Sequence, residues 1–263
     1  MIQVQEFRPS RRKGIYTRDD QAPRQINDFY PTPATYREAM RDLLPHLPSG
    51  ITRAWEPAAG DGQLMDTLTG LGFAVVGSDL APGRSDIAQF DFLIDRPGAQ
   101  MPEGAELAGF IATNPPFHLL DRFTGRFLGL LDHPGTQVRA VSLFMPWTRL
   151  AADCRTEAVR RANVILRMPW RTRFFRPGDG SFTPPGTADY CWVLWTQDRP
   201  ALGPVVVTAP KPSTADRNED GAISEFVPRA RRGITARYAR DAGRRVARFG
   251  SRRPATEPAL PTP

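Results

Sequence analysis

The sequence predicts a doubly wound α/β fold built on a mainly parallel β-sheet. Short apolar segments with strand character alternate along the chain with segments of helical periodicity. Residues 51–55, 63–71 and 73–77 form the first strand, helix and strand, and a unit of this order has parallel strands and a right-handed crossover. The length of 263 residues suits one sizeable domain. Together these features favour a sheet with helices on both faces.

The remaining elements follow the same alternation. A helix is expected over 34–44, because the rigid turn at Pro31 and Pro33 precedes it and Pro45 ends it. Glycine and proline residues mark 169–189 as a long hairpin connection between the last two strands. Further strands are expected at 110–113, 140–144, 164–168 and 190–196, and further helices at 119–131 and 151–162.

Composition divides the chain into three parts. Residues 1–25 are expected to form a basic flexible arm, 26–210 the folded domain, and 211–263 a polar to Arg-rich, disordered tail. From Arg229 onward, ten Arg residues face only Asp241 and Glu257, so residues 229–263 carry the whole formal excess of +7. Basic ends beside a neutral domain favour a polyanionic partner. The alternative is a pair of solvated tails with no partner.

Cysteine, histidine and hydropathy patterns exclude other classes of protein. Cys154 and Cys191 have neither a CxxC nor a metal-ligand spacing, and the three His residues are scattered, so we expect no metal site and no disulfide framework. The amino terminus shows no signal peptide, and no apolar run approaches the ~20 residues of a membrane span. We therefore expect a soluble, cytoplasmic protein that does not contact a membrane.

A glycine-containing loop at 56–62 (Glu-Pro-Ala-Ala-Gly-Asp-Gly) follows the first strand and precedes a helix. Gly60 and Gly62 let a ligand approach the backbone closely, because no Cβ obstructs it. A dinucleotide-binding loop would have a small residue where this chain has Met65, so a smaller, nucleoside-like ligand is favoured. Asp79, at the end of the second strand, can accept both hydroxyls of a ribose. Alternatively, it caps the turn before Pro82.

The tetrapeptide Asn114-Pro115-Pro116-Phe117 is the most informative motif in the sequence, and it directly follows the apolar strand at 110–113. The prolines fix φ, so the Pro115 carbonyl and the Asn114 side-chain carbonyl form two rigid acceptors at the edge of the sheet. Two acceptors aimed at one planar amine would favour a tetrahedral, nucleophilic nitrogen. Phe117 would stack on the base that carries the amine. The alternative is a strand-terminating turn with a core phenylalanine.

At this point the chain resembles the class I methyltransferases, and within them the phage-borne and solitary adenine-specific DNA methyltransferases. The resemblance covers about 30–196, and its motifs occur in the family's order: Tyr-Pro-Thr-Pro at 30–33, the loop at 56–62, Asp79, Asp91-Phe92, and Asn-Pro-Pro-Phe at 114–117. It implies a seven-stranded, Rossmann-like methyltransferase sheet and S-adenosyl-L-methionine as cofactor. It also implies methyl transfer to the N6 amine of adenine in DNA, with the target base flipped out of the duplex.

The resemblance also implies residue roles. Tyr30, Thr32, Gly60 and Gly62 would hold the methionine end of the cofactor and Glu56 its amino group, with Asp79 on the ribose and Asp91 and Phe92 on the adenine. For the last two, the alternative is a charged turn and a core aromatic residue. The catalytic contacts would come from Asn114, Pro115, Pro116 and Phe117. No general base is required, because the amine becomes acidic only after methyl transfer, so positioning supplies the rate.

The sequence has no segment of 80 or more residues that could form a separate target-recognition domain, so it predicts neither a recognition sequence nor an oligomeric state. The expected nucleic-acid-facing part is the 169–189 connection and its approach, where cations and aromatic residues alternate. Solvated arginines at a strand end are the alternative. The cations are Arg167, Arg171, Arg173 and Arg176, and the aromatic residues are Trp170, Phe174 and Phe175.

Three other functions fit parts of the same pattern. The first two are methylation of adenine in RNA and of a protein glutamine amide, which also needs paired acceptors around a planar amine. Enzymes that modify glutamine have Tyr where this chain has Phe117, and the basic ends favour a nucleic acid. The third is a noncatalytic nucleic-acid-binding protein on a methyltransferase scaffold, which the presence of Glu56, Asp79 and Asn114 disfavours.

Overall fold

The structure is a computed structural model that describes residues 31–94, 101–171, 173–176, 181–182 and 188–212. All of them belong to one compact unit, which ends at Ser224. The predicted basic arm at 1–25 and nearly all of the predicted tail lie outside the described residues, as does Tyr30. Among the residues that the structure describes, no helix is both long and apolar enough to cross a membrane.

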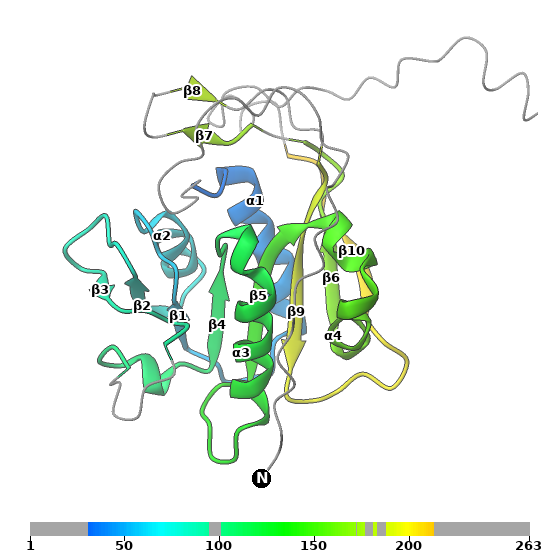
Figure 1. Ribbon diagram of the computed structural model, residues 1–263, viewed down its shortest axis with the longest axis horizontal. Coiled ribbons are helices and arrows are strands. Elements are labelled where there is room, and N and C mark those ends of the chain that lie inside the picture. The colour runs from blue at the N-terminus through cyan, green and yellow to red at the C-terminus, as the bar shows by residue number, and fades with distance from the viewer. Residues whose placement is uncertain (1–30, 95–100, 172, 177–180, 183–187, 213–263) are drawn as a thin grey trace, which may run out of the picture. The chain divides into compact units, whose positions relative to one another are not determined.

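An eight-stranded sheet forms the centre of the unit, in the order β10-β6-β9-β5-β4-β1-β2-β3 (Figure 1). β9 runs antiparallel to β5 and β6, and every other neighbouring pair is parallel. A separate antiparallel pair, β7 (Phe175–Arg176) and β8 (Ser181–Phe182), lies in the predicted 169–189 connection. The main strands are β1 (Arg53–Glu56), β2 (Ala74–Asp79), β3 (Ala88–Gln89), β4 (Phe110–Thr113), β5 (Ala140–Pro146), β6 (Val164–Arg167), β9 (Tyr190–Thr196) and β10 (Val205–Thr208).

The doubly wound, mainly parallel sheet is confirmed, but the expected number of seven strands is wrong. Neither β3 nor β10 was predicted from the sequence. β3 spans two exposed residues, which is too short for any periodicity to appear. β10 is an edge strand with mostly exposed side chains, and it pairs only with β6. Its three valines therefore lack the buried, bounded pattern by which an inner strand is recognised.

The helices differ from the expected ones mainly at their ends. The predicted helix at 34–44 consists of α1 (Ala34–Glu38) followed by a 3-10 helix, η2 (Ala39–His46). The predicted helix at 151–162 is interrupted, because Ala152 has an extended backbone with φ −84° and ψ 133°. The other helices are α2 (Gln63–Gly70), α3 (Leu120–Asp132) and α4 (Thr156–Arg161), and the shorter 3-10 turns are η3 (Ala105–Leu107), η4 (Phe117–Leu119), η5 (Trp147–Ala151) and η6 (Asp153–Arg155).

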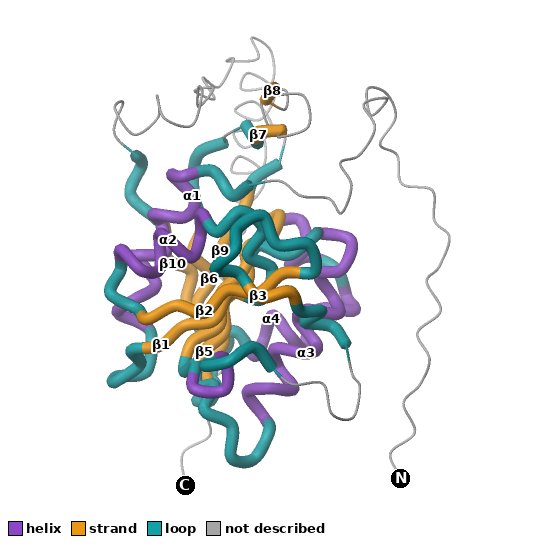
Figure 2. The backbone as a smooth tube through the Cα atoms, turned by 90° about the vertical axis from the view of Figure 1, so that its left-hand side faces the viewer, coloured by secondary structure: helices purple, strands orange, loops and turns teal. Residues whose placement is uncertain are grey.

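Helices cover both faces of the sheet, and Figure 2 shows the strands between the two layers. Within β4, Phe110 and Ala112 pack in the core on the side of α1, η2 and α2, whereas Ile111 packs with α3 on the opposite side. All four residues of β4 are therefore buried, as expected for a parallel strand covered on both faces. Each large apolar side chain buried in this way contributes about 1.5–3 kcal/mol.

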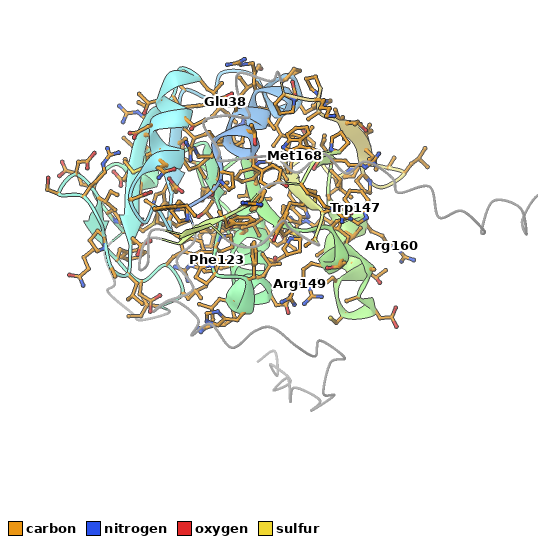
Figure 3. The ribbon with its side chains drawn as sticks, turned by 90° about the horizontal axis from the view of Figure 1, so that it is seen from above. Glu38, Phe123, Trp147, Arg149, Arg160 and Met168 are labelled. Carbon is orange, nitrogen blue, oxygen red and sulfur yellow. The ribbon has the colours of Figure 1, made fainter. Side chains whose placement is uncertain are left out.

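Two long-range hydrogen bonds fix α1 relative to the sheet. The indole Nε1 of Trp192 in β9 donates to the Tyr36 carbonyl at 2.8 Å, and the Tyr36 hydroxyl donates to the Trp170 carbonyl at 3.0 Å. Tyr36 is fully buried. These bonds hold the segment that precedes α1, including Thr32, near the carboxyl ends of the strands. That edge lies toward the top of Figure 1, and Figure 3 looks down on it.

Candidate functional site

A cavity of about 860 Å³ opens at the carboxyl edge of the parallel strands. This is the edge at which open α/β sheets bind their ligands, and the volume is typical of a small-molecule site. The cavity brings together most of the residues that the sequence predicted, although they come from separate loops. Those that line it are Thr32, Glu56, Gly60, Asp79, Asp91, Phe92, Asn114, Pro115, Pro116 and Phe117.

Gly62 does not line the cavity, although it belongs to the predicted glycine loop. It is the N-cap of α2 and has a left-handed backbone with φ 82°. A Cβ at this position would lie 2.5 Å from Nη1 of Arg84, whose guanidinium also pairs with Asp66 and Asp86. The conformation of the turn and the packing of Arg84 therefore account for Gly62, whereas Gly60 lies at the cavity wall.

Asp79 connects the glycine loop to the end of β2. Its Oδ2 accepts the Gly60 backbone N–H at 2.9 Å, and its Oδ1 accepts the Ala81 N–H at 2.8 Å. A carboxylate oxygen has two acceptor positions, so each oxygen retains one for a further donor. Asp79 thus caps the turn, as the structural alternative predicted, and also contributes to the cavity wall.

Glu56, the last residue of β1, is a buried carboxyl group in the cavity wall. Glu56 is 3% exposed, and its side-chain oxygen Oε2 has no hydrogen-bond partner. Burial, and after it the negative charges of Asp79 and Asp61, raise the pKa of Glu56 well above its ordinary value. A buried carboxyl oxygen without a partner is costly, and a cationic ligand would compensate that cost. Glu56 therefore forms a site suited to an ammonium group.

Asn114 is held by a residue far from it in sequence. Its side-chain nitrogen, Nδ2, donates to the Thr32 hydroxyl at 2.9 Å. The next turn is fixed by the Leu119 N–H, which donates to the Pro116 carbonyl at 2.8 Å. Because the amide nitrogen is engaged by Thr32, the amide oxygen is the acceptor on the opposite side of the group. Thr32 thus orients the Asn114 amide, and the paired-acceptor role of Asn114 and Pro115 stays a prediction.

Three aromatic side chains, Phe117, Phe174 and Tyr190, line the same cavity. The rings of Phe117 and Tyr190 are 5.9 Å apart, and those of Phe174 and Tyr190 are 5.1 Å apart. Behind them, Phe144 stacks on Tyr190 at 5.2 Å with an interplanar angle of 6°. Burial raises the pKa of Tyr190 to about 12. We call Phe117, Phe174 and Tyr190 the aromatic wall, and a planar ring can stack there.

Asp91 and Phe92 are a turn residue and a core aromatic residue, as the structural alternative predicted, and both also lie at the cavity. Asp91 accepts the Leu93 N–H through Oδ1 at 2.9 Å, which makes it a turn residue. Phe92 is 2% exposed and packs against Trp55 and Phe123, with ring centroids 5.3 Å and 5.1 Å away. Both residues nevertheless line the cavity. Both residues therefore have structural contacts and also form part of the cavity wall.

Sequence reasoning missed several lining residues. Leu80 is 58% exposed and directly follows Asp79, so its place beside a predicted site residue could have identified it. Tyr190 begins the predicted strand at 190–196, at the end of the long connection, which is a weaker signal. Asp61 and Gln63 lie in and directly after the predicted glycine loop, and nothing local in the sequence marks the others. The missed residues include Asp61, Gln63, Leu80, Phe90, Phe123, Arg149 and Tyr190.

Arg167, Arg171 and Arg173 do not line the cavity. Arg167 is exposed at the end of β6, and Arg171 pairs with Asp189 at 2.7 Å. Arg173 is half-buried, and the side chain of Arg176 lies outside the described residues. The structure does not test whether these residues contact a nucleic acid.

The expectation that Trp170 faces a nucleic acid is wrong. Trp170 is 5% exposed, and its ring stacks on Tyr36 with the centroids 6.0 Å apart. The Tyr36 hydroxyl donates a hydrogen bond to the backbone carbonyl of Trp170, and this bond holds Trp170 in the core. Phe174 is also buried and faces the cavity, whereas Phe175 is exposed. Of the three aromatic residues in this stretch, Trp170 and Phe174 therefore point inward and Phe175 does not.

Similarities to known proteins are remote. No protein-family model and no curated protein matches the chain. Its structure is similar to that of a type I restriction-modification system methyltransferase subunit from Streptococcus thermophilus, with a TM-score of 0.45 and 10% identity over 71% of this chain and 51% of that one. A modification subunit of a putative type I restriction enzyme from Vibrio vulnificus YJ016 has a TM-score of 0.43 and 15% identity, with 70% and 50% covered.

The 23S rRNA methyltransferase ErmE has a TM-score of 0.39 and 13% identity, with 66% of this chain and 71% of that chain covered. The chain spans about half the length of the two restriction-system structures. Among the described residues, no three His, Cys, Asp or Glu side chains are grouped as metal ligands would be. The residues of the cavity are therefore the basis on which we infer a function.

Proposed function

We propose that this chain is an S-adenosyl-L-methionine-dependent methyltransferase that modifies the N6 amine of adenine in DNA. One observation carries the proposal. A single cavity is lined by the buried carboxyl of Glu56, whose Oε2 has no hydrogen-bond partner, by the Asn114 amide, which Thr32 orients, and by the rings of Phe117 and Tyr190. The first feature suits a cationic cofactor, and the second suits a planar amine that receives a group from it.

Residues at or after the carboxyl ends of β1, β2 and β3 suit this cofactor. Glu56 would accept from its ammonium group, and Asp79 would accept from its ribose hydroxyls through the second acceptor position of each oxygen. Asp91 would accept from the adenine amine, while Phe92 and Leu80 supply apolar wall beside it. When bound, S-adenosyl-L-methionine supplies a methyl group activated by a sulfonium.

The residues that follow β4 would position the amine. The Asn114 amide oxygen and the Pro115 carbonyl would each accept one N–H of the target, which directs the nitrogen lone pair away from them. The aromatic wall would hold the base by stacking, after the base leaves the duplex. The amine's proton is lost to solvent after transfer, so these residues act by positioning and need no basic side chain.

Methyl transfer to defined polymers tests the proposal. The purified chain is incubated with tritiated S-adenosyl-L-methionine and, separately, with unmethylated double-stranded DNA, single-stranded DNA, RNA and a protein extract. We expect label in N6-methyladenine of DNA, and its loss in Asn114→Ala protein that still binds the cofactor. An exposed variant, Arg160→Gln on α4, serves as the matched control and should label DNA normally.

Other outcomes would overturn specific parts. Label in RNA or in a protein glutamine would contradict the DNA substrate and leave the cofactor assignment standing. Binding of the cofactor without any transfer would favour a noncatalytic nucleic-acid-binding protein. Failure to bind the cofactor at all would contradict the interpretation of Glu56.

A further inference from the structure

The charges in the cavity wall are divided between the two halves of the sheet. Its four carboxyl groups lie at or after the strands β1, β2 and β3, which occupy one end of the sheet order: Glu56, Asp61, Asp79 and Asp91. In the described part of the chain, Arg149 is the only Arg or Lys that lines the cavity, and it lies in η5 directly after β5. The acidic half suits a cationic group of a ligand, and the cationic half suits an anionic group.

Arg149 lies next to the Asn-Pro-Pro-Phe motif. Its Nη2 donates to the Phe117 carbonyl at 3.2 Å. This bond uses one of the five N–H donors of the guanidinium. Among the described residues, no carboxylate forms an ion pair with Arg149, and Asp121 is paired with Arg155 instead. The side chain therefore brings further donors and a positive charge to the cavity.

The positive charge of Arg149 helps to lower the pKa of Asp121, but Asp121 is already bound by another arginine. Arg155 donates to both oxygens of Asp121, at 2.6 Å and 2.8 Å. This hydrogen-bonded pair is the main cause that lowers the pKa of Asp121, and the charge of Arg149 is the smallest contribution. Arg155 thus compensates Asp121, and the charge of Arg149 is left for a ligand.

We propose that Arg149 binds the phosphate of the nucleotide whose base enters the aromatic wall. The inference rests on the proposed function and names its substrate class: a nucleotide within a polynucleotide, as opposed to a glutamine within a protein. A stacked base brings its own phosphate to the mouth of the cavity, and a guanidinium binds phosphate through several charge-assisted hydrogen bonds. A glutamine is flanked by neutral peptide groups, which offer Arg149 no anion.

Salt-dependent binding of a polynucleotide by the full chain tests this assignment. The probe is a fluorescently labelled, unmethylated double-stranded oligonucleotide, titrated at several salt concentrations against wild type, Arg149→Gln and Arg160→Gln. Arg160 is the matched control, because it is an exposed arginine of α4 outside the cavity wall, and Figure 3 labels both side chains. Single-stranded DNA and RNA probes of the same sequence distinguish the sources of the phosphate.

We expect Arg149→Gln to weaken binding on the order of tenfold at low salt, the loss expected for a hydrogen-bonded charge. The slope of log K against log salt is negative, and its magnitude should decrease by about 0.9, which corresponds to the loss of one phosphate contact. Arg160→Gln should retain the wild-type slope. Arg149→Lys, which keeps the charge, should recover most of the affinity, and this recovery separates a charge effect from a folding defect.

The inference is overturned if Arg149→Gln binds every polynucleotide with the wild-type affinity and slope. It is also overturned if Arg149→Lys is as weak as Arg149→Gln, because the side chain then acts through its bond to Phe117. The proposed function fails separately, in the methyl-transfer assay. If no polymer is methylated and the magnitude of the slope still decreases in Arg149→Gln, the phosphate site stands and the enzymatic activity does not.

Discussion

The side-chain nitrogen of Asn114 donates a 2.9 Å hydrogen bond to the hydroxyl of Thr32, a residue 82 positions earlier in the chain. Thr32 is 6% exposed, and its carbonyl oxygen accepts a hydrogen bond from Arg37 of α1. The residue is thus fixed on both sides, and it determines which end of the Asn114 amide accepts. This relationship connects the segment before α1 with the end of β4.

Replacement of Thr32 by Val should lower kcat on the order of 10²-fold, because the Asn114 amide loses its orienting partner and the target amine is misplaced. Thr32→Ser keeps the hydroxyl and should retain most of the activity. Single-turnover methyl transfer to DNA at saturating cofactor measures the effect, so that a change in cofactor affinity does not contribute to it. A loss in Thr32→Ser as large as that in Thr32→Val would contradict the prediction, because Ser keeps the hydroxyl that orients Asn114.

The raised pKa of Glu56 predicts a stability that falls as pH rises. Above the ordinary glutamate pKa the unfolded chain releases this proton while the folded chain retains it, so the free energy of unfolding decreases by about 1.4 kcal/mol per pH unit until the folded pKa is reached. Glu56→Gln cannot titrate and should lose this component. Urea unfolding of both proteins from pH 5 to pH 8 measures the difference between their slopes, and identical slopes would contradict the prediction.

The same group should link cofactor binding to pH. Glu56 must ionise to pair with an ammonium group, so the affinity for S-adenosyl-L-methionine should increase with pH while Glu56 is neutral in the free protein. Calorimetry in buffers of different ionisation enthalpy should detect proton release on binding. Glu56→Gln should bind weakly and should release no proton from this site. Proton uptake by wild type would exclude Glu56 as the ammonium ligand.

Tyr190 should act through its ring. Tyr190→Ala should raise KM for DNA about tenfold, in the range expected when a stacking partner of one base is removed, whereas Tyr190→Phe should remain close to wild type. Because burial raises the pKa of Tyr190 to about 12, the hydroxyl stays neutral at assay pH, and both proteins should show the same pH dependence up to pH ~10. A large loss of activity in Tyr190→Phe would assign a role to the hydroxyl.

Two glycines should respond oppositely to alanine. Gly62→Ala places a Cβ 2.5 Å from Arg84 in a backbone with φ 82°, and the left-handed conformation alone costs about 1–2 kcal/mol of stability. Gly125 lies inside α3, and a Cβ there would meet nothing within 4 Å. Gly125→Ala should therefore stabilise the protein by about 0.5–1 kcal/mol. Urea denaturation of the three proteins compares them directly.

Periodicity predicted the inner strands well and the outer ones poorly. The expected strands at 110–113 and 190–196 are β4 and β9 with the same bounds, because both are buried along nearly their whole length. The exposed edge strands β3 and β10 carry no such signal. The helix expected at 151–162 is interrupted at Ala152, where the pattern of apolar residues does not reveal the extended backbone.

The sequence by itself determined the order of the elements and the motifs at their ends, because turn residues and apolar periodicity act over a few neighbouring positions. Only the tertiary structure decided which of these motifs meet. Arg149 reaches Phe117 because β4 and β5 are neighbours in the sheet and end at the same edge. Thr32 reaches Asn114 because Tyr36 of α1 is hydrogen-bonded to Trp192 of β9. Trp170 was assigned to the surface and lies in the core for the same reason: its environment comes from Tyr36, 134 positions away from it.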